Sequence, residues 1–361
     1  MKKLVTLLLA LVMSLSLAAC GGASGGESAA SATPSASAAA GTDAKTYNVV
    51  WVTCSTESEF WQYQQIGMEN ACADMEEQYG VKINFSTVGP ATEAETEAYI
   101  RAFENAIASK PDVIISATQV PDSTVSVAKE ATDQGIIVNF TNCGLEPVGS
   151  TQYADSYNQF YTTSSADVGK LAGQTMLDSL KAAGSPLKGY IAMEFSNVNA
   201  SLQPRMDEFK AYLNANAPDI KVLDTLYNNN DMAAAQKDIE NEIATYGDQL
   251  IGIYGANNIS GDGIALAVKN AGIADKVITI GVDSDATEIE ALTAGNLDCI
   301  IVQDAYGQGY NSVKNAIETI IKGANPESEQ QIAVLPVAVT TKNMNEDKYA
   351  AMLDPTILKK K

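Results

Sequence analysis

The chain has 361 residues, of which 46% are hydrophobic and 19% charged, so it contains enough apolar material for two packed domains. Its formal net charge of −21 repels phosphate backbones, which argues against nucleic acid as a partner. Histidine is absent, which excludes the commonest general base and metal ligand and every Ser-His or Cys-His catalytic pair. The five cysteines have no CxxC spacing, so the sequence predicts neither a metal site nor a cofactor.

The N-terminus has the pattern of a secretory signal. Two lysines precede the uncharged, mostly apolar run Leu4–Ala19, which is shorter than the ~20 residues of a membrane span and suits a signal peptide over 1–19. The Leu-Ala-Ala that precedes Cys20 resembles the bacterial lipobox, in which the cysteine is lipidated; a plain signal peptide with a chance cysteine is the alternative. Up to residue 44 the chain is nearly all Gly, Ala, Ser, Thr and Pro, which predicts a flexible tether over 20–44.

From Lys45 onward, short β-branched runs alternate with amphipathic stretches such as Glu93–Ser109 and Tyr306–Lys322. The runs are continuously apolar and each precedes a helix, which predicts an α/β fold with doubly wound parallel sheets covered on both faces. The predicted strands are Asn48–Thr53, Val81–Thr87, Asp112–Ser116, Ile136–Phe140, Gly189–Phe195, Lys221–Leu226, Leu250–Tyr254, Val277–Val282 and Cys299–Gln303.

The strands and helices are too many for one doubly wound sheet of common size. The pattern weakens between Asn142 and Thr163, where Gly, Pro, Ser, Asn and Tyr dominate, and we expect the chain to cross there between two α/β lobes. Ligands of open parallel sheets bind beyond the carboxyl ends of the strands, so the candidate site residues are those that follow each strand.

Aromatic residues follow the first predicted strand. Phe60 and Trp61 can offer a flat apolar face to the C–H face of a sugar ring, and packing of a helix against the sheet is the alternative for both. In the second half, Asn257 and Asp283 follow predicted strands, where helix capping is the alternative. Because Asp285 and Glu288 have capping-box spacing, we expect Asp283 to be free for a ligand.

Two further polar residues are candidates in the second half. Arg205 follows a loop after the strand Gly189–Phe195, and its guanidinium can donate to paired oxygens; a surface salt bridge is the alternative. Gln303 closes the last predicted strand. For Asn257, we expect Asn258 or Ser260 to cap the following helix and to leave Asn257 free.

The sequence from about 47 to 341 resembles the periplasmic ribose-binding protein family, whose two-lobed fold is shared by the lactose-repressor ligand domain. The most specific matches are Tyr254-Gly-Ala-Asn-Asn258, Gly281-Val-Asp-Ser284 and Ile301-Val-Gln303, followed by Gly307 and Gly309-Tyr310. The resemblance implies a type 1 periplasmic binding protein with a three-segment hinge. Lobe one would take 45–163 and 304–336, and lobe two 164–303 and 337–361.

The resemblance also implies a set of sugar contacts. Ribose binders have Asp-Arg where this chain has Thr141 and Asn142, and Asn where it has Ser58, so ribose itself is not the expected ligand. The predicted ligand-binding residues are Phe60, Trp61, Asn142, Arg205, Asn257, Asp283 and Gln303.

The sequence therefore predicts a monomeric, lipid-anchored, extracytoplasmic protein, without enzymatic activity, that captures a monosaccharide for the permease of an ABC importer. A nucleoside or furanosyl-signal binder and a receptor that presents sugar to a chemoreceptor or histidine kinase remain alternatives. A glycosidase would need paired carboxylates, for which Glu194 and Asp283 are the one pair to nominate. A disulfide between Cys54 and Cys143 is possible in an extracellular protein.

Overall fold

The computed structural model describes residues 44–197 and 202–360, so the predicted signal peptide, Cys20 and nearly all of the predicted tether lie outside the described residues. Within the described residues the strands form two sheets, one with six strands and one with seven. No helix of these residues is both long enough and apolar enough to cross a membrane. The predicted α/β fold with two parallel-sheet lobes is confirmed.

The first sheet has the strand order β12-β5-β4-β3-β1-β2, and all of its pairs are parallel. Its side chains alternate between two cores, because successive residues of a strand point to opposite faces. With the four helices that cover it, this sheet forms the first lobe. Its elements are β1 (Thr46–Val52), α1 (Glu59–Tyr79), β2 (Lys82–Val88), α2 (Thr96–Ala108), β3 (Val113–Ser116), α3 (Pro121–Asp133), β4 (Ile137–Thr141), β5 (Gln159–Thr162), α9 (Ala305–Lys322) and β12 (Gln331–Ala333).

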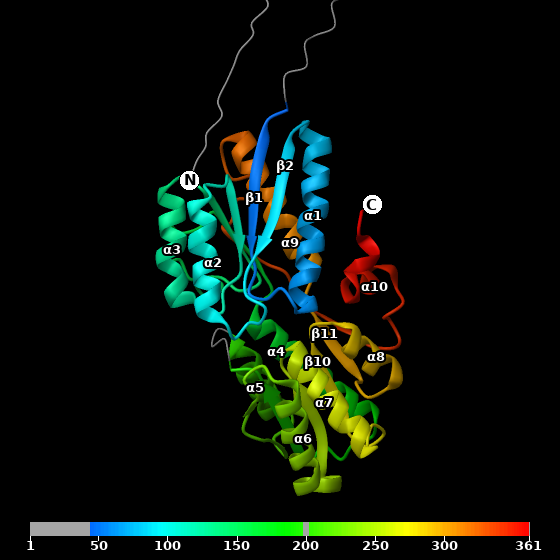
Figure 1. Cartoon of the computed structure of the whole chain (residues 1–361). Coiled ribbons are helices and arrows are strands. Elements are labelled where there is room, and N and C mark those ends of the chain that lie inside the picture. The colour runs from blue at the N-terminus through cyan, green and yellow to red at the C-terminus, as the bar shows by residue number, and fades with distance from the viewer. Residues whose placement is uncertain (1–43, 198–201, 361) are drawn as a thin grey trace, which may run out of the picture. The chain divides into compact units, whose positions relative to one another are not determined.

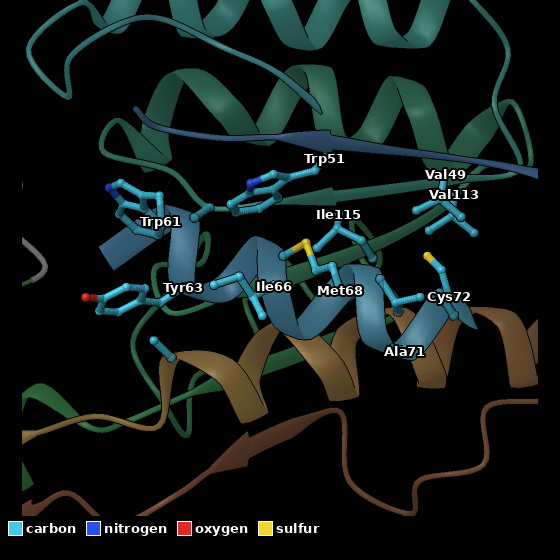
Figure 2. Packing of buried hydrophobic residues seen from close by; sticks show 14 of the residues in the cluster. Val49, Trp51, Trp61, Tyr63, Ile66, Met68, Ala71, Cys72, Val113 and Ile115 are labelled. Carbon is cyan, nitrogen blue, oxygen red and sulfur yellow. The ribbon is translucent and has the colours of Figure 1, made fainter. Parts of the chain in front are cut away.

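Helices α1 and α9 cover one face of this sheet, and α2 and α3 cover the other (Figure 1). Trp51 and Ile115 of the sheet pack against Ile66 and Met68 of α1, as Figure 2 shows. The intervening residues of the same strands face Phe103 of α2 instead. This double coverage explains why the strands are continuously apolar in the sequence.

The second sheet has the strand order β13-β11-β10-β9-β6-β7, with β8 paired to β6, and only β13 is antiparallel to its neighbour among the described strands. Helices α4 and α5 pack on one face and α6 and α7 on the other. These elements form the second lobe. They are α4 (Ser165–Ala182), β6 (Gly189–Phe195), α5 (Pro204–Asn216), β7 (Ile220–Val222), β8 (Leu226–Tyr227), α6 (Met232–Tyr246), β9 (Leu250–Gly255), α7 (Asn258–Ala271), β10 (Ile278–Val282), α8 (Ala286–Ala294), β11 (Cys299–Val302), β13 (Val337–Val339) and α10 (Asp347–Leu353).

The chain passes between the two sheets after β5, after β11 and between β12 and β13. Thr163, in the first crossing, accepts a hydrogen bond of 3.2 Å at its Oγ1 from Gln308 Nε2 of α9, the helix that follows the second crossing. Asp304 lies in the second crossing and caps α9, because its Oδ1 accepts from the backbone N–H of Gly307 at 2.8 Å.

Some sequence-based boundaries were wrong. The segment 142–163 is not only a crossover, because its end forms the strand β5, in which buried Gln159 and Thr162 hide the apolar signal. The strand predicted over Lys221–Leu226 is instead divided into the short strands β7 and β8. The helix predicted from Glu93 begins at Thr96, after a turn in which Glu95 Oε2 accepts from the N–H of Thr92.

Candidate ligand-binding site

A cavity lies between the carboxyl ends of the strands of the two sheets. It contains about 380 Å³ of space that no atom fills, part of which is open to solvent. Six of the seven predicted ligand-binding residues line it, and Gln303 does not. The first lobe contributes Phe60, Trp61, Glu93, Gln119, Asn142 and Cys143, and the second lobe contributes Ser196, Leu202, Arg205, Asn257, Asn258 and Asp283.

The aromatic wall comes from the first turn of α1. The rings of Phe60 and Trp61 meet edge to face, with centroids 5.0 Å apart. Both side chains are buried and belong to the core cluster that includes Trp51, so they pack against the sheet and also line the cavity. The indole Nε1 of Trp61 donates to Glu93 Oε1 at 2.7 Å, which fixes the ring. The sequence suggested two roles for these side chains, lining a ligand site and packing the helix against the sheet, and the structure shows that they do both.

Arg205 and Asp283 form a buried charged pair in the second lobe. Arg205 Nη1 lies 3.6 Å from Asp283 Oδ2 and donates to the carbonyl of Ala256 at 2.8 Å, while its Nε has no partner among the described residues. The alternative of a surface salt bridge for Arg205 is wrong, since only 2% of its side chain is exposed. Burial raises the pKa of Asp283, and Arg205 together with Gln303 counteracts this.

Gln303 and Asn142 connect the lobes behind the cavity. Gln303 Nε2 donates to Asp283 Oδ1 at 2.5 Å, and its Oε1 accepts from Asn142 Nδ2 at 3.1 Å. Gln303 therefore positions Asp283 and does not face the cavity. Asn142 and Asp283 have φ values of 59° and 78°, a left-handed conformation that non-glycine residues adopt mainly where the surrounding structure requires it.

The expectations for the two helix starts have different outcomes. Asp285 Oδ1 accepts from the N–H of Glu288 at 2.9 Å, so Asp285 caps α8 and Asp283 is not needed as a cap, as predicted. Asn257, however, is not free. Its Oδ1 accepts from Ser260 Oγ at 2.6 Å and its Nδ2 donates to Asn230 Oδ1 at 3.2 Å, so it reaches the cavity as part of a fixed polar network.

Glu93 and Gln119 line the cavity although sequence reasoning did not nominate them. Glu93 was assigned to a helix but lies in the loop before α2. Gln119 Nε2 donates to Glu93 Oε2 at 3.3 Å, and Gln119 Oε1 is buried and finds no partner within residues 44–197 and 202–360. Both follow strands, β2 and β3, so the rule of inspecting carboxyl ends would have found them. Burial raises the pKa of Glu93, the hydrogen bond from the Trp61 indole lowers it, Asp283 raises it and Arg205 lowers it, and the net shift is upward.

Two pairings that the sequence suggested, a disulfide and a pair of carboxylates in one site, are not formed. Cys54 and Cys143 are free thiols, so the suggested disulfide is absent. Burial raises the pKa of Cys143 to about 12. Glu194 does not line the cavity, and its Oε1 accepts from Asn228 Nδ2 at 3.0 Å. The residues that the structure describes contain no cluster of three His, Cys, Asp or Glu side chains that could hold a metal ion.

Comparison with known proteins identifies the family. The model of the periplasmic binding protein domain matches residues 49–324. The chain belongs to this family. The predicted resemblance to sugar-binding type 1 periplasmic binding proteins is thereby confirmed, and family membership indicates an extracytoplasmic location.

Individual relatives of this periplasmic binding protein agree with that assignment. A Rhizobium meliloti protein provisionally named rhizopine-binding protein is 25% identical over 240 residues, which are 66% of this chain and 74% of that protein. An ABC transporter solute-binding protein of Agrobacterium vitis with bound D-fucose has a TM-score of 0.74 and 26% identity, covering 85% of this chain and 100% of that one. The fold is also that of a Bacillus halodurans ABC transporter solute-binding protein with bound myo-inositol, with a TM-score of 0.67, 23% identity and coverage of 86% and 99%.

Proposed function

We propose that this protein captures a monosaccharide or related polyol outside the cell membrane and delivers it to an ABC importer. The observation that carries the proposal is the cavity in which the aromatic wall of the first lobe faces the Arg205–Asp283 pair of the second. Aromatic faces suit the C–H face of a sugar ring, while guanidinium and carboxylate groups suit its hydroxyls. The Agrobacterium vitis relative with bound D-fucose supports this chemistry.

Capture follows from the division of the site between two lobes. A ligand that contacts both walls stabilises the closed arrangement by interactions that are absent when the lobes separate. Specificity comes from the polar groups, because a buried hydroxyl or a buried Arg205 Nε without a partner costs about 1–3 kcal/mol. The three crossings between the sheets supply the hinge.

We further infer that the mature protein begins at Cys20, carries lipid on that cysteine and is held at the membrane by the segment 20–44 as a tether. In this arrangement residues 45–163 and 304–336 act as one lobe, 164–303 and 337–361 as the other, and the closed monomer docks on a membrane permease. Replacing Cys20 by alanine tests the anchor. We expect the variant to move from the membrane fraction to the soluble fraction, and unchanged membrane association would contradict the inference.

Titration calorimetry with a panel of sugars and polyols tests the function. The panel contains D-fucose, D-arabinose, D-tagatose and myo-inositol, together with nucleosides as the alternative ligand class. We expect saturable binding of at least one sugar or polyol at one site per chain. Binding of nucleosides alone would contradict the proposal, and so would the absence of binding to every sugar and polyol.

A further inference from the structure

The first-lobe wall of the cavity contains more hydrogen-bond acceptors than the protein itself satisfies. Glu93 lines this wall, and among the described residues each of its carboxylate oxygens has one hydrogen-bond partner, the indole of Trp61 or the amide of Gln119. A carboxylate has about four acceptor sites in all. The Oε1 of Gln119 is buried and has no partner in the part of the chain that the structure describes. A ligand group at this wall can therefore donate several hydrogen bonds.

The charges of the cavity are also unbalanced. Arg205 is the one cationic side chain among the described residues of the lining, and it lies 3.6 Å from Asp283. Glu93 is the second carboxylate; its two hydrogen-bond partners are neutral, no ion pair in the described part of the chain includes it, and the charge of Arg205, which lowers its pKa, is shared with Asp283. Two partly desolvated carboxylates that share one cation are costly, and a bound cation reduces that cost.

From these two observations we infer that the preferred ligand is an amino-substituted polyol, whose ammonium group binds Glu93 and Gln119 Oε1 while its hydroxyls bind Arg205 and Asp283. This inference rests on the proposed function and narrows its substrate class. An ammonium carries three donors and a positive charge, whereas a hydroxyl carries one donor. The ammonium therefore satisfies the acceptor surplus and the charge imbalance at once, and a neutral sugar satisfies neither completely.

The competing explanation is that Glu93 serves only to hold Trp61. In that case Glu93 would act equally on neutral and amino-substituted ligands, because it would affect the position of the aromatic wall and nothing else. Glu93→Gln separates the two explanations. The amide keeps an oxygen for the Trp61 indole, and a rotated Gln119 amide can accept from its nitrogen through Oε1, so the wall keeps its hydrogen bonds.

The test is calorimetry with matched pairs, in which each neutral compound is compared with the analogue that has one hydroxyl replaced by an amine. The pairs are glucose and glucosamine, galactose and galactosamine, fucose and fucosamine, and inositol and aminodeoxyinositol, all at a pH at which the amine is protonated. We expect the amino member of at least one pair to bind about 10- to 100-fold more tightly, the margin of one charge-assisted hydrogen bond. Glu93→Gln should remove most of that margin. Glu97→Gln, the same change at an exposed helix position, should leave it unchanged.

The outcomes separate the two proposals. If neutral sugars bind and no amino analogue binds more tightly, the inference is overturned and sugar capture stands. The same holds if an amino analogue is preferred equally by the wild type and by Glu93→Gln. If no compound of any pair binds, the proposed function fails, and the inference fails with it.

Discussion

Replacing Asp283 by asparagine separates the binding role of the buried pair from its structural role. The amide has the same shape and tolerates the φ of 78° at this position. Its Oδ1 can keep the hydrogen bond from Gln303 Nε2, so the amide nitrogen takes the place of Oδ2, 3.6 Å from Arg205 Nη1. The variant therefore loses one charged acceptor and the charge that balances Arg205.

We expect the substitution to lower both the affinity for the ligand and the stability of the fold. A hydrogen bond from a ligand hydroxyl to a charged group contributes about 1.5–3 kcal/mol, which corresponds to a rise of about 10- to 150-fold in Kd. Stability should fall by about 3–5 kcal/mol, because removing the charge of Asp283 leaves the buried Arg205 guanidinium without a balancing charge, and its remaining hydrogen bond to Ala256 does not replace that charge.

Titration calorimetry with the tightest-binding polyol gives the affinity, and thermal unfolding without ligand gives the stability. Asp275→Asn, the same change at an exposed position, serves as the matched control and should alter neither quantity. A Kd for Asp283→Asn within about twofold of the wild-type value would refute the assignment of Asp283 to the ligand, since a charged hydrogen bond contributes more than that.

Four further predictions concern the fold around the site. Gly169→Ala should lower stability by about 1–3 kcal/mol and weaken ligand binding, because the added Cβ would lie 2.2 Å from the carbonyl oxygen of Arg205 and must push α5 away; unchanged unfolding and binding curves would contradict this. Burial raises the pKa of Glu194 from 4.5 to about 8, so the folded state holds a proton that the unfolded chain releases, and stability should fall as the pH rises from about 4.5 to above 8. In denaturant unfolding at several pH values, Glu194→Gln should reduce that fall by about 1–2 kcal/mol, and a pH dependence equal to that of the wild type would count against the assignment. Cys54, Cys72, Cys143 and Cys299 are buried free thiols, so mass-spectrometric mapping should find them alkylated by iodoacetamide only after denaturation, and a linked Cys54–Cys143 peptide would contradict the structure. Glu59→Ala should weaken ligand binding about three- to tenfold, because Glu59 Oε2 accepts a hydrogen bond from the N–H of Ala286 at 2.9 Å and so joins the two lobes. The repulsion between Glu59 and the carboxylates of Asp262 and Asp285 is screened by water and does not cancel this contribution. The exposed variant Glu57→Ala should bind normally, and equal affinities for the two variants would disprove the contact.

The sequence predicts the fold well because both sheets are parallel and covered on both faces. Strands of that kind are continuously apolar, as in Val113–Ser116 and Cys299–Val302, and are visible without any alignment. The short strands β5, β12 and β13 were not predicted. Their residues are few or polar, so no local pattern marks them.

The candidate site was predicted in part. Asp283, directly after β10, and Trp61, in the first turn of the helix after β1, were found because the topology brings the segments beyond the carboxyl ends of the strands together. Glu93 was missed because it was assigned to the helix: the polar and alanine residues at 92–95 are equally typical of a helix start, so the sequence does not mark the turn that places it in the cavity. The burial of Arg205 and the engagement of Asn257 depend on groups distant in the sequence, Ala256 and Asn230, and local patterns contain no information about such contacts.

A crystal structure of the protein with its tightest-binding sugar or polyol tests the central claim most directly. We expect the ring to lie against Trp61 in the cavity between the lobes, with hydroxyls bonded to Arg205 and Asp283. A ligand bound elsewhere, or one held in the cavity without contact to either Arg205 or Asp283, would contradict the account.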